Sequence, residues 1–267
     1  MKAILKYPGN RRISMNNTKI DWCDSTWNPI TGCLHGCEYC YARGIAERFG
    51  GKQKFANIFE EDEPVIGTDG KTVAYPHSFS PTFLKYHLDD YINKKGRNIF
   101  VCSMADLFGD WVPDNWIREV FAVCEKAPQH NYLFLTKNPR RYVELAEKGI
   151  LKYLDNMWYG WTETSSGNRP GLMCFPGNST NNLKTFVSVE PILGPIRPGL
   201  ADWIIVGAET GKRKDKVIPE REWIRQIAED CREYGIPLFM KSSLADIWGE
   251  LLIQEFPEKL KNKNEVK

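Results

Sequence analysis

Three cysteines stand close together near the N-terminus of the chain. Cys33, Cys37 and Cys40 lie in the stretch TWNPITGCLHGCEYCYAR with the spacing C-x3-C-x2-C. Thiolates bind soft metals, so three cysteines on one short loop indicate a metal site. Structural zinc usually takes two separated pairs of ligands, and the sequence contains no second pair. In a four-iron cluster, three cysteines would leave one iron open to an outside ligand, as in reactive metal sites.

Other ligand sets stay open on the residues alone. His35 could complete a zinc site, although it stands only two residues from Cys33 and from Cys37, a poor spacing for binding the same ion. Cys23 is a more distant candidate for a fourth ligand. Cys102, Cys124 and Cys231 fall in apolar runs or on apolar helix faces and are expected to be core thiols.

Short apolar runs separated by polar loops predict the framework that positions the cysteines. The runs are strand-length and nearly continuous in apolar character, which is typical of strands buried on both faces of a parallel sheet. They span 98–103, 131–136, 157–163, 184–190, 202–209 and 236–242. Helical patterns bounded by proline and glycine lie at 80–96, 113–127, 138–149 and 219–235. A strand before the cysteine loop and a helix after it complete the repeat. The order favours an α/β fold with a partial or complete parallel TIM-like barrel.

Composition and segment boundaries agree with a globular protein. The chain has 267 residues, a net charge of +2, 42% hydrophobic and 26% charged residues, and no apolar run of membrane-spanning length. We expect a cytoplasmic protein with reduced cysteines, because the N-terminus lacks a secretory apolar core. The expected organisation is an N-terminal extension (1–20), the barrel (21–250) with loop insertions at 50–80 and 164–183, and a polar C-terminal tail (251–267).

The cysteine loop resembles that of the radical S-adenosylmethionine (SAM) enzymes, where an aromatic residue, here Tyr39, precedes the last cysteine. The wider string TWNPITGCLHGCEYCYAR is similar to a phage- and bacterium-associated family of radical-SAM-like proteins of unassigned function. LTKNPRR, VSVEPILGPI, WIIVGAETG and PLFMKS extend the similarity, which runs from about Thr26 to Ser242. More distantly, the arrangement resembles spore photoproduct lyase. Two stretches depart from the family, namely the Gly/Asn-rich loop after WTET and Lys241-Ser242-Ser243, where Lys-Gln-Trp-Gly is common.

The resemblance implies a barrel of the radical SAM type and a specific chemistry. Cys33, Cys37 and Cys40 would bind a [4Fe-4S] cluster whose open iron holds SAM. A low-potential electron donor, flavodoxin or ferredoxin, would supply an electron that cleaves SAM to methionine and a 5′-deoxyadenosyl radical. That radical would abstract hydrogen from a substrate that the sequence does not identify. Cys174 would then be a catalytic thiol or a ligand of a second cluster, with an ordinary loop cysteine as the alternative.

Polar residues at the ends of the apolar runs are the candidate SAM contacts, because ligand sites of parallel barrels lie at the C-terminal strand ends. Ser103 or Asp106 would meet the methionyl ammonium group, and Lys137 would meet the carboxylate. Thr162 and Glu163 would hold the ribose hydroxyls. The further candidates are Ser188, Glu190, Gly207, Glu209 and Lys241, with Tyr39 shielding the cluster. Each carboxylate has an alternative role as a helix cap or as the partner of a nearby cation.

Two basic loops predict an anionic substrate such as a nucleic acid or nucleotide. They span 137–141, where Arg140 and Arg141 fall in the first turn of a helix, and 210–216. Cations there oppose the helix dipole and become favourable if a phosphate binds, and Arg169 would join them. A solvated charge run is the alternative. For the whole protein, the alternatives are a non-catalytic zinc- or iron-sulfur-binding barrel that acts as a nucleic-acid or protein interaction module, and an iron-sulfur electron carrier.

Overall fold

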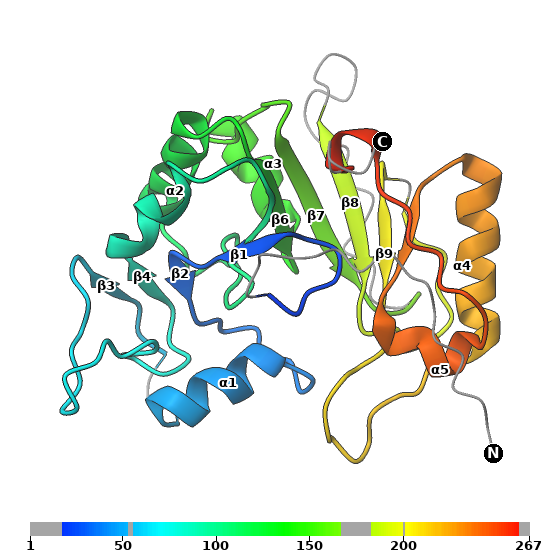
Figure 1. Cartoon of the computed structure of the whole chain (residues 1–267), viewed down its shortest axis with the longest axis horizontal. Coiled ribbons are helices and arrows are strands. Elements are labelled where there is room, and N and C mark those ends of the chain that lie inside the picture. Colours follow the sequence, from blue (N-terminus) through cyan, green and yellow to red (C-terminus); the bar gives the residue numbers. More distant parts are fainter. Residues whose placement is uncertain (1–17, 53–55, 167–182, 200, 262–267) are drawn as a thin grey trace.

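A seven-stranded parallel sheet forms the centre of the molecule (Figure 1). The computed structural model describes residues 18–52, 56–166, 183–199 and 201–261. The strand order is β1-β5-β6-β7-β8-β9-β10, and every neighbouring pair is parallel. The strands are β1 (Ser25–Trp27), β5 (Asn98–Val101), β6 (Asn131–Thr136), β7 (Met157–Glu163), β8 (Lys184–Val189), β9 (Ile204–Val206) and β10 (Leu238–Met240). The expected α/β class is confirmed, and the sheet is a partial barrel with β1 and β10 at its edges.

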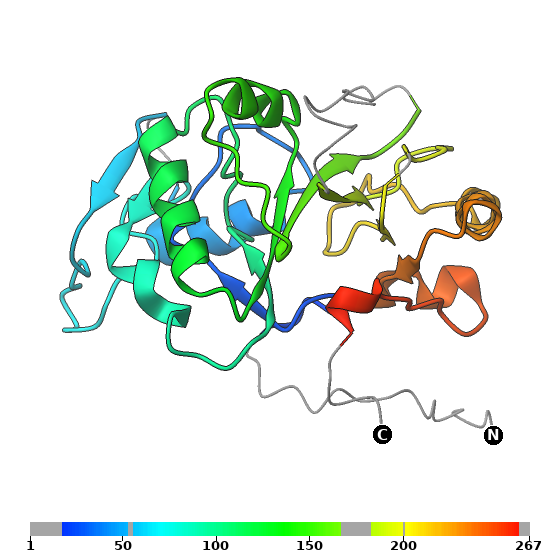
Figure 2. The same ribbon diagram turned by 90° about the horizontal axis from the view of Figure 1, so that it is seen from above.

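Three helices cover the outer side of this sheet (Figure 2). They are α2 (Asp114–Lys126), α3 (Arg140–Glu147) and α4 (Arg221–Tyr234), which confirms three of the predicted helices with starts one or two residues later. The apolar face of α2 inserts Trp116 and Phe121 into the main core. Gly235 ends α4 in the left-handed conformation, with φ of 66°, which glycine adopts at little cost.

The fourth predicted helix, at 80–96, is wrong. Thr82–Leu84 forms strand β4, and Lys85–Tyr91 is a 3-10 helix. The strand belongs to a second sheet, in which β4 pairs with β2 (Ile30–Thr31) and β3 (Phe59–Glu61). Its three residues are fully buried there, so pairing with distant segments outweighs the local helix signal. The expected loop insertion at 50–80 thus contributes a strand to the structure.

The inner side of the large sheet has a floor of large side chains. Alternate strand residues face it, as the two-residue repeat of a strand requires. The floor consists of Trp22, Phe100, Leu133, Trp158, Phe186, Trp203, Ile205 and Phe239. Gly160 leaves room for it, because a Cβ at this position would lie 2.4 Å from the ring of Phe186. On β7 and β8 and directly after β9, the next inward positions toward the strand ends are Gly160, Ser188 and Gly207, so small residues lie above the aromatic floor.

Residues 251–261 differ from the expected polar tail. Ile253 accepts a hydrogen bond from the backbone of Met240 in β10, at 2.7 Å. Farther along, the Leu260 carbonyl accepts one from the Asn98 side chain of β5, at 2.8 Å. The segment therefore crosses the N-terminal end of the sheet, and Leu260 and Phe256 pack on the aromatic floor. No helix in the described part of the chain is both long and apolar enough to cross a membrane.

Candidate metal and cofactor site

The cysteine loop lies at the C-terminal ends of the strands, held by a close backbone contact. Gly32 precedes Cys33 with φ of 84°, and a Cβ there would lie 2.1 Å from the Ser80 carbonyl oxygen. Its N–H donates to the carbonyl of Met104 at 2.9 Å, and the N–H of Cys33 donates to that of Phe79 at 3.2 Å. Only glycine fits this approach, so the residue before the first cysteine fixes where the loop meets the segment that precedes β4.

The three thiols are free and partly buried. Cys40 caps α1 (Tyr41–Gly50), since its sulfur accepts the Arg43 N–H at 3.4 Å. The pKa of the Cys33 thiol is raised to about 12, mainly by burial and also by the charges of Asp106, Cys40 and Cys37, while a backbone hydrogen bond at His35 opposes the rise. A thiol in this environment becomes a thiolate when a cation replaces its proton, which is the coupling expected of a metal ligand.

The cysteine loop offers three thiols as donors, while its imidazole already has another partner. Among the described residues, no three His, Cys, Asp or Glu side chains are grouped to hold one ion. Zinc requires its ligands to converge on that ion, whereas the cysteines of a four-iron cluster bind different irons. His35 is also engaged elsewhere, because its Nε2 lies 2.7 Å from Asp106 Oδ2. Cys33, Cys37 and Cys40 are thus the residues that would hold a cluster.

Asp106 connects the cysteine loop to the ends of β5 and β6. Besides His35, its carboxylate accepts the backbone N–H of Lys137 at 2.9 Å and that of Phe108 at 3.0 Å. The side chain is buried, so these protein groups take the place of water as the partners of its carboxylate oxygens. Either Asp106 or Ser103 was expected to meet an ammonium group, and the contacts of Asp106 suit it to positioning the cysteine loop.

Lys137 and Ser103 also contact the cysteine loop or the strand before it. The Lys137 ammonium donates to the Tyr39 hydroxyl at 3.2 Å and lies 5.1 Å from the centre of its ring. Burial raises the pKa of Tyr39, and the positive charge of Lys137 opposes that shift. Ser103 donates its hydroxyl to the Asn28 side chain at 3.1 Å, and its carbonyl accepts the Tyr41 hydroxyl at 2.7 Å.

The ends of β8 to β10 bring further candidates together. Lys241, after β10, forms an ion pair with Glu190, after β8. Gly207 lies between them, and a Cβ there would be 3.0 Å from Lys241 Cδ and 3.4 Å from Glu190. Ser188 is buried on the inner face, while Thr162 remains partly exposed. The Lys241–Glu190 pair therefore packs against the backbone at Gly207, where there is no side chain to keep it away.

Glu163 lies on the opposite side of the sheet from these residues. Its Oε1 accepts the indole N–H of Trp161 at 2.9 Å, and Trp161 belongs to the core that packs under the helices. Neighbouring residues of a strand point to opposite faces, so Thr162 and Glu163 cannot share one ligand. The expected ribose contact of Glu163 does not fit this placement. Cys174 and Arg169 lie outside the described residues.

The two basic loops contribute fewer available cations than expected. Arg141 is buried and contacts Asp114 at 2.6 Å and Glu144 at 3.1 Å. Arg213 donates two hydrogen bonds to Glu209, at 2.8 and 2.7 Å, and their effect lowers the pKa of that carboxyl.

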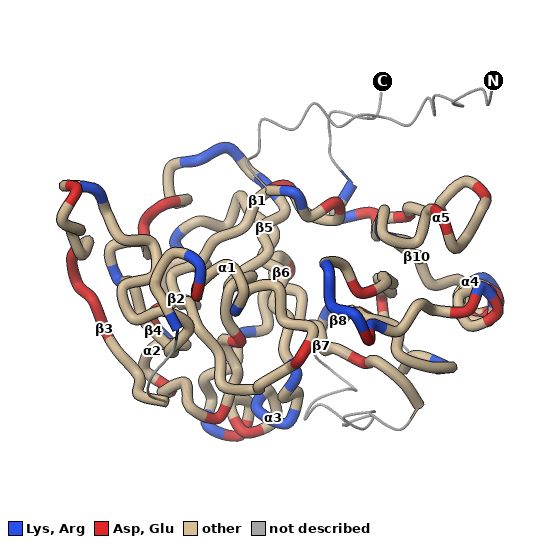
Figure 3. The backbone as a smooth tube through the Cα atoms, turned by 90° about the horizontal axis from the view of Figure 1, so that it is seen from below, with Lys and Arg blue, Asp and Glu red and all other residues tan. Residues whose placement is uncertain are grey.

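Arg213 also lies 3.6 Å from Glu38, so it joins the 210–216 loop to the cysteine loop, with α1 on the same side of the sheet in Figure 1. Arg140, Lys212 and Lys214 remain exposed, among the blue segments of Figure 3.

Comparison with known proteins places the chain in a family. A family profile described as a protein of unknown function (DUF5131) matches residues 17–265. The chain belongs to the DUF5131 family. Comparison with curated proteins and with solved structures found no match. The DUF5131 match includes the cysteine loop, both sheets and the C-terminal segment, so it covers all the elements that build the site.

Several contacts of this DUF5131 chain were missed from the sequence. Asn28 holds the loop after β5, since its side-chain oxygen accepts the backbone N–H of Met104 at 3.0 Å as well as the Ser103 hydroxyl. Trp111 lies against His35, with ring centres 4.8 Å apart. Asn28 could have been found from the sequence, because it falls in the TWNP string before the cysteines. No local sequence pattern indicated Trp111.

Proposed function

We propose that this protein is a radical SAM enzyme acting on an anionic substrate, a nucleic acid or nucleotide. The observation that carries the proposal is the position of three free thiols at the C-terminal ends of a partial parallel barrel, where ligands of such sheets bind. When bound, a reduced [4Fe-4S] cluster supplies the electron that cleaves SAM to methionine and a 5′-deoxyadenosyl radical.

The chain's own residues contribute binding, orientation and exclusion of water in this proposal. Cys33, Cys37 and Cys40 hold the cluster, and Asp106 keeps their loop in place through His35. The Lys241–Glu190 pair and Glu209 offer charged groups of both signs for the amino-acid part and the hydroxyls of SAM. The Trp158 and Phe186 rings form a dry floor beneath, which strengthens electrostatic contacts above it.

Anaerobic reconstitution tests the cluster and the cleavage reaction. We expect about four irons and four sulfides per chain. Adding dithionite and SAM should produce 5′-deoxyadenosine, measured by chromatography and mass spectrometry. Cys33→Ser, Cys37→Ser and Cys40→Ser should each abolish the product, while Cys231→Ala, on the buried face of α4, should retain it. Bound zinc without cleavage would overturn the proposal.

The substrate class is tested separately, through the exposed cations. The double variant Lys212→Glu/Lys214→Glu should weaken oligonucleotide binding and flatten its dependence on salt, because fewer counterions are released. Lys71→Glu, on an exposed turn of another part of the chain, is the control. Unchanged binding of every oligonucleotide by the double variant would remove nucleic acid from the proposal. A flavodoxin or ferredoxin remains the proposed electron donor.

One observation favours the alternative of a non-catalytic metal-binding interaction module. Several charged side chains at the strand ends already have protein partners, namely Asp106, Glu190, Glu209, Arg213 and Lys241. Such mutual pairing also occurs where ion pairs serve structure alone. The same reconstitution separates the two candidates, because a module would bind its metal and leave SAM intact.

A further inference from the structure

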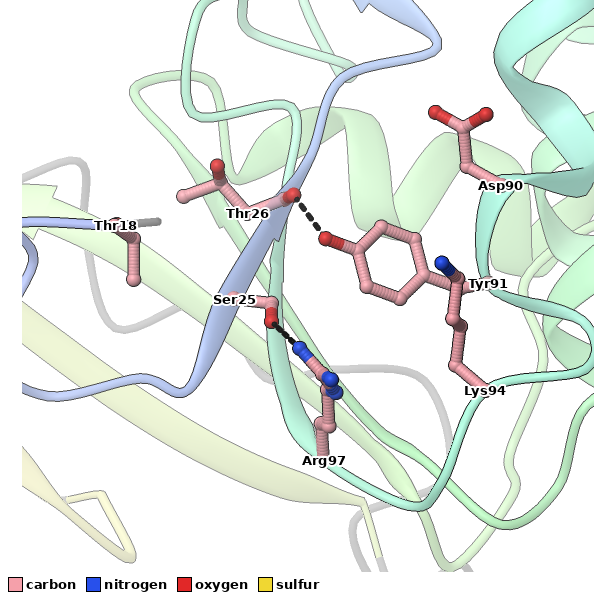
Figure 4. Close-up of a pocket in the computed structure, with 7 residues that line it drawn as sticks. All are labelled: Thr18, Ser25, Thr26, Asp90, Tyr91, Lys94 and Arg97. Carbon is pink, nitrogen blue, oxygen red and sulfur yellow. Dashed lines mark hydrogen bonds between the residues drawn. The ribbon is translucent and has the colours of Figure 1, made fainter. Parts of the chain in front are cut away.

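A polar pocket lies at the end of the sheet opposite the cysteine loop, and Figure 4 shows the residues that line it. Ser25 begins β1 and Arg97 stands directly before β5, so the pocket opens at the N-terminal ends of these parallel strands. Its volume is about 380 Å³. Small-molecule pockets commonly have volumes of about 300–1,000 Å³. The lining residues are Thr18, Ser25, Thr26, Asp90, Tyr91, Lys94 and Arg97.

The lining combines two cations with hydroxyl groups. The Arg97 guanidinium donates to the Ser25 hydroxyl at 2.9 Å, which directs it across the pocket toward β1. The Tyr91 hydroxyl donates to the Thr26 carbonyl at 3.0 Å and fixes the opposite wall. Within the described part of the chain, the Lys94 ammonium group forms no ion pair. Its charge is therefore available to a ligand.

Among the described lining residues, Asp90 carries the one carboxylate, and it is already engaged. Asp90 Oδ2 lies 2.8 Å from His87 Nδ1, and the side chain stands at one end of the pocket. Repulsion of an anion by Asp90 is correspondingly reduced. The described lining residues therefore carry more positive than negative charge. A planar guanidinium and a mobile ammonium group lie beside hydroxyls that can donate or accept hydrogen bonds.

We propose that this pocket binds the terminal phosphate of a small phosphorylated molecule. A phosphate monoester carries a charge of about −1.5 to −2 and three acceptor oxygens, which matches two cations surrounded by hydroxyls. A carboxylate offers only two acceptor oxygens and a single charge. The inference does not rest on the proposed radical chemistry, since the pocket is remote from the cysteines and needs no metal.

Calorimetric titration of the full-length, metal-free chain tests the pocket. The probes are inorganic phosphate, AMP, adenosine and a single-stranded oligonucleotide with hydroxyl ends, which carries only phosphodiesters. We expect phosphate and AMP to bind and adenosine not to bind. Lys94→Gln should weaken AMP binding by about tenfold, the loss of one charge-assisted contact. Lys94 is exposed, so this variant should fold normally.

Two matched variants locate the binding. Lys95→Gln alters the exposed neighbour outside the pocket lining, and Lys71→Gln alters an exposed turn in another part of the chain. Both should bind AMP as the unchanged chain does. The proposal is overturned if millimolar phosphate and AMP fail to bind, or if Lys94→Gln has no effect. It is equally overturned if binding of the hydroxyl-ended oligonucleotide depends on Lys94 and binding of AMP does not. The pocket would then bind nucleic acid through its phosphodiesters.

Discussion

At the scale of single residues, charged side chains at the strand ends bind other groups of the protein. Asp106 shows this most clearly, because one carboxylate serves His35 on the cysteine loop and the backbone of Lys137 and Phe108. Such a buried acceptor is costly to lose, since each donor would then be left without a partner. The geometry of the cysteine loop thus depends on a residue that lies 71 positions from His35 in the sequence.

Replacing Asp106 by Asn should loosen the cysteine loop. We expect a loss of about 1–3 kcal/mol in unfolding free energy. Pulsed iodoacetamide labelling, read by mass spectrometry, should become faster at Cys33, Cys37 and Cys40 and stay slow at the buried Cys231. Asp246→Asn, at the start of the short helix α5 (Ala245–Trp248), is the control. Equal labelling rates in both variants would show that Asp106 does not hold the loop.

At the scale of elements, an ion-pair network joins helices α2 and α3. Asp114, in the first turn of α2, contacts Arg141 at 2.6 Å and Lys148 at 2.8 Å, at the two ends of α3. The hydrogen bond from Lys148, together with the charge of Arg141, lowers the pKa of Asp114. The folded state therefore holds this carboxylate ionised more strongly than the unfolded state does.

Asp114→Asn should reduce stability at neutral pH by about 1–3 kcal/mol. Because the folded pKa is the lower one, the contribution is complete above the unfolded pKa of about 3.9. It is lost as the pH falls through the folded value, so the two proteins should converge in acid. Urea unfolding across pH 3 to 7 measures this, with Glu147→Gln on an exposed site of α3 as the control. A difference that persists unchanged in acid would contradict the ion-pair explanation.

At the scale of the whole molecule, a partial barrel leaves its inner face to be covered. The C-terminal segment covers the aromatic floor. Leu260 is almost fully buried there, and the ring of Phe256 contacts those of Trp203 and Phe239. The indole of Trp203 donates to the Glu255 carbonyl at 3.0 Å. This segment is therefore part of the core, although its composition is polar.

Deleting residues 251–267 should lower the unfolding free energy by several kcal/mol, since large buried side chains lose their partners. The truncated chain should also bind a hydrophobic dye as the floor becomes exposed. Leu251→Ser, at a side chain that is 73% exposed, is the control and should leave the denaturation midpoint unchanged. If the deletion were equally harmless, the segment would not be a structural part of the fold.

By itself, the sequence determined the strands of the parallel sheet, three outer helices and the loop that carries the cysteines. Each of these follows from a local pattern, such as a continuous apolar run, a helical repeat or the C-x3-C-x2-C spacing. Tertiary structure decided what local patterns do not contain. Thr82–Leu84 became a strand because β2 and β3 pair with it.

The direction and partners of charged side chains were likewise decided only in the folded chain. Glu163 points away from the inner face, Arg213 is bound by Glu209, and Arg97 meets Ser25 across a pocket. Burial and ion pairing depend on which distant elements the fold brings within a few ångströms of one another. A residue's type and its spacing along the chain define the chemistry it can perform, whereas its neighbours in space determine whether that group is already bound.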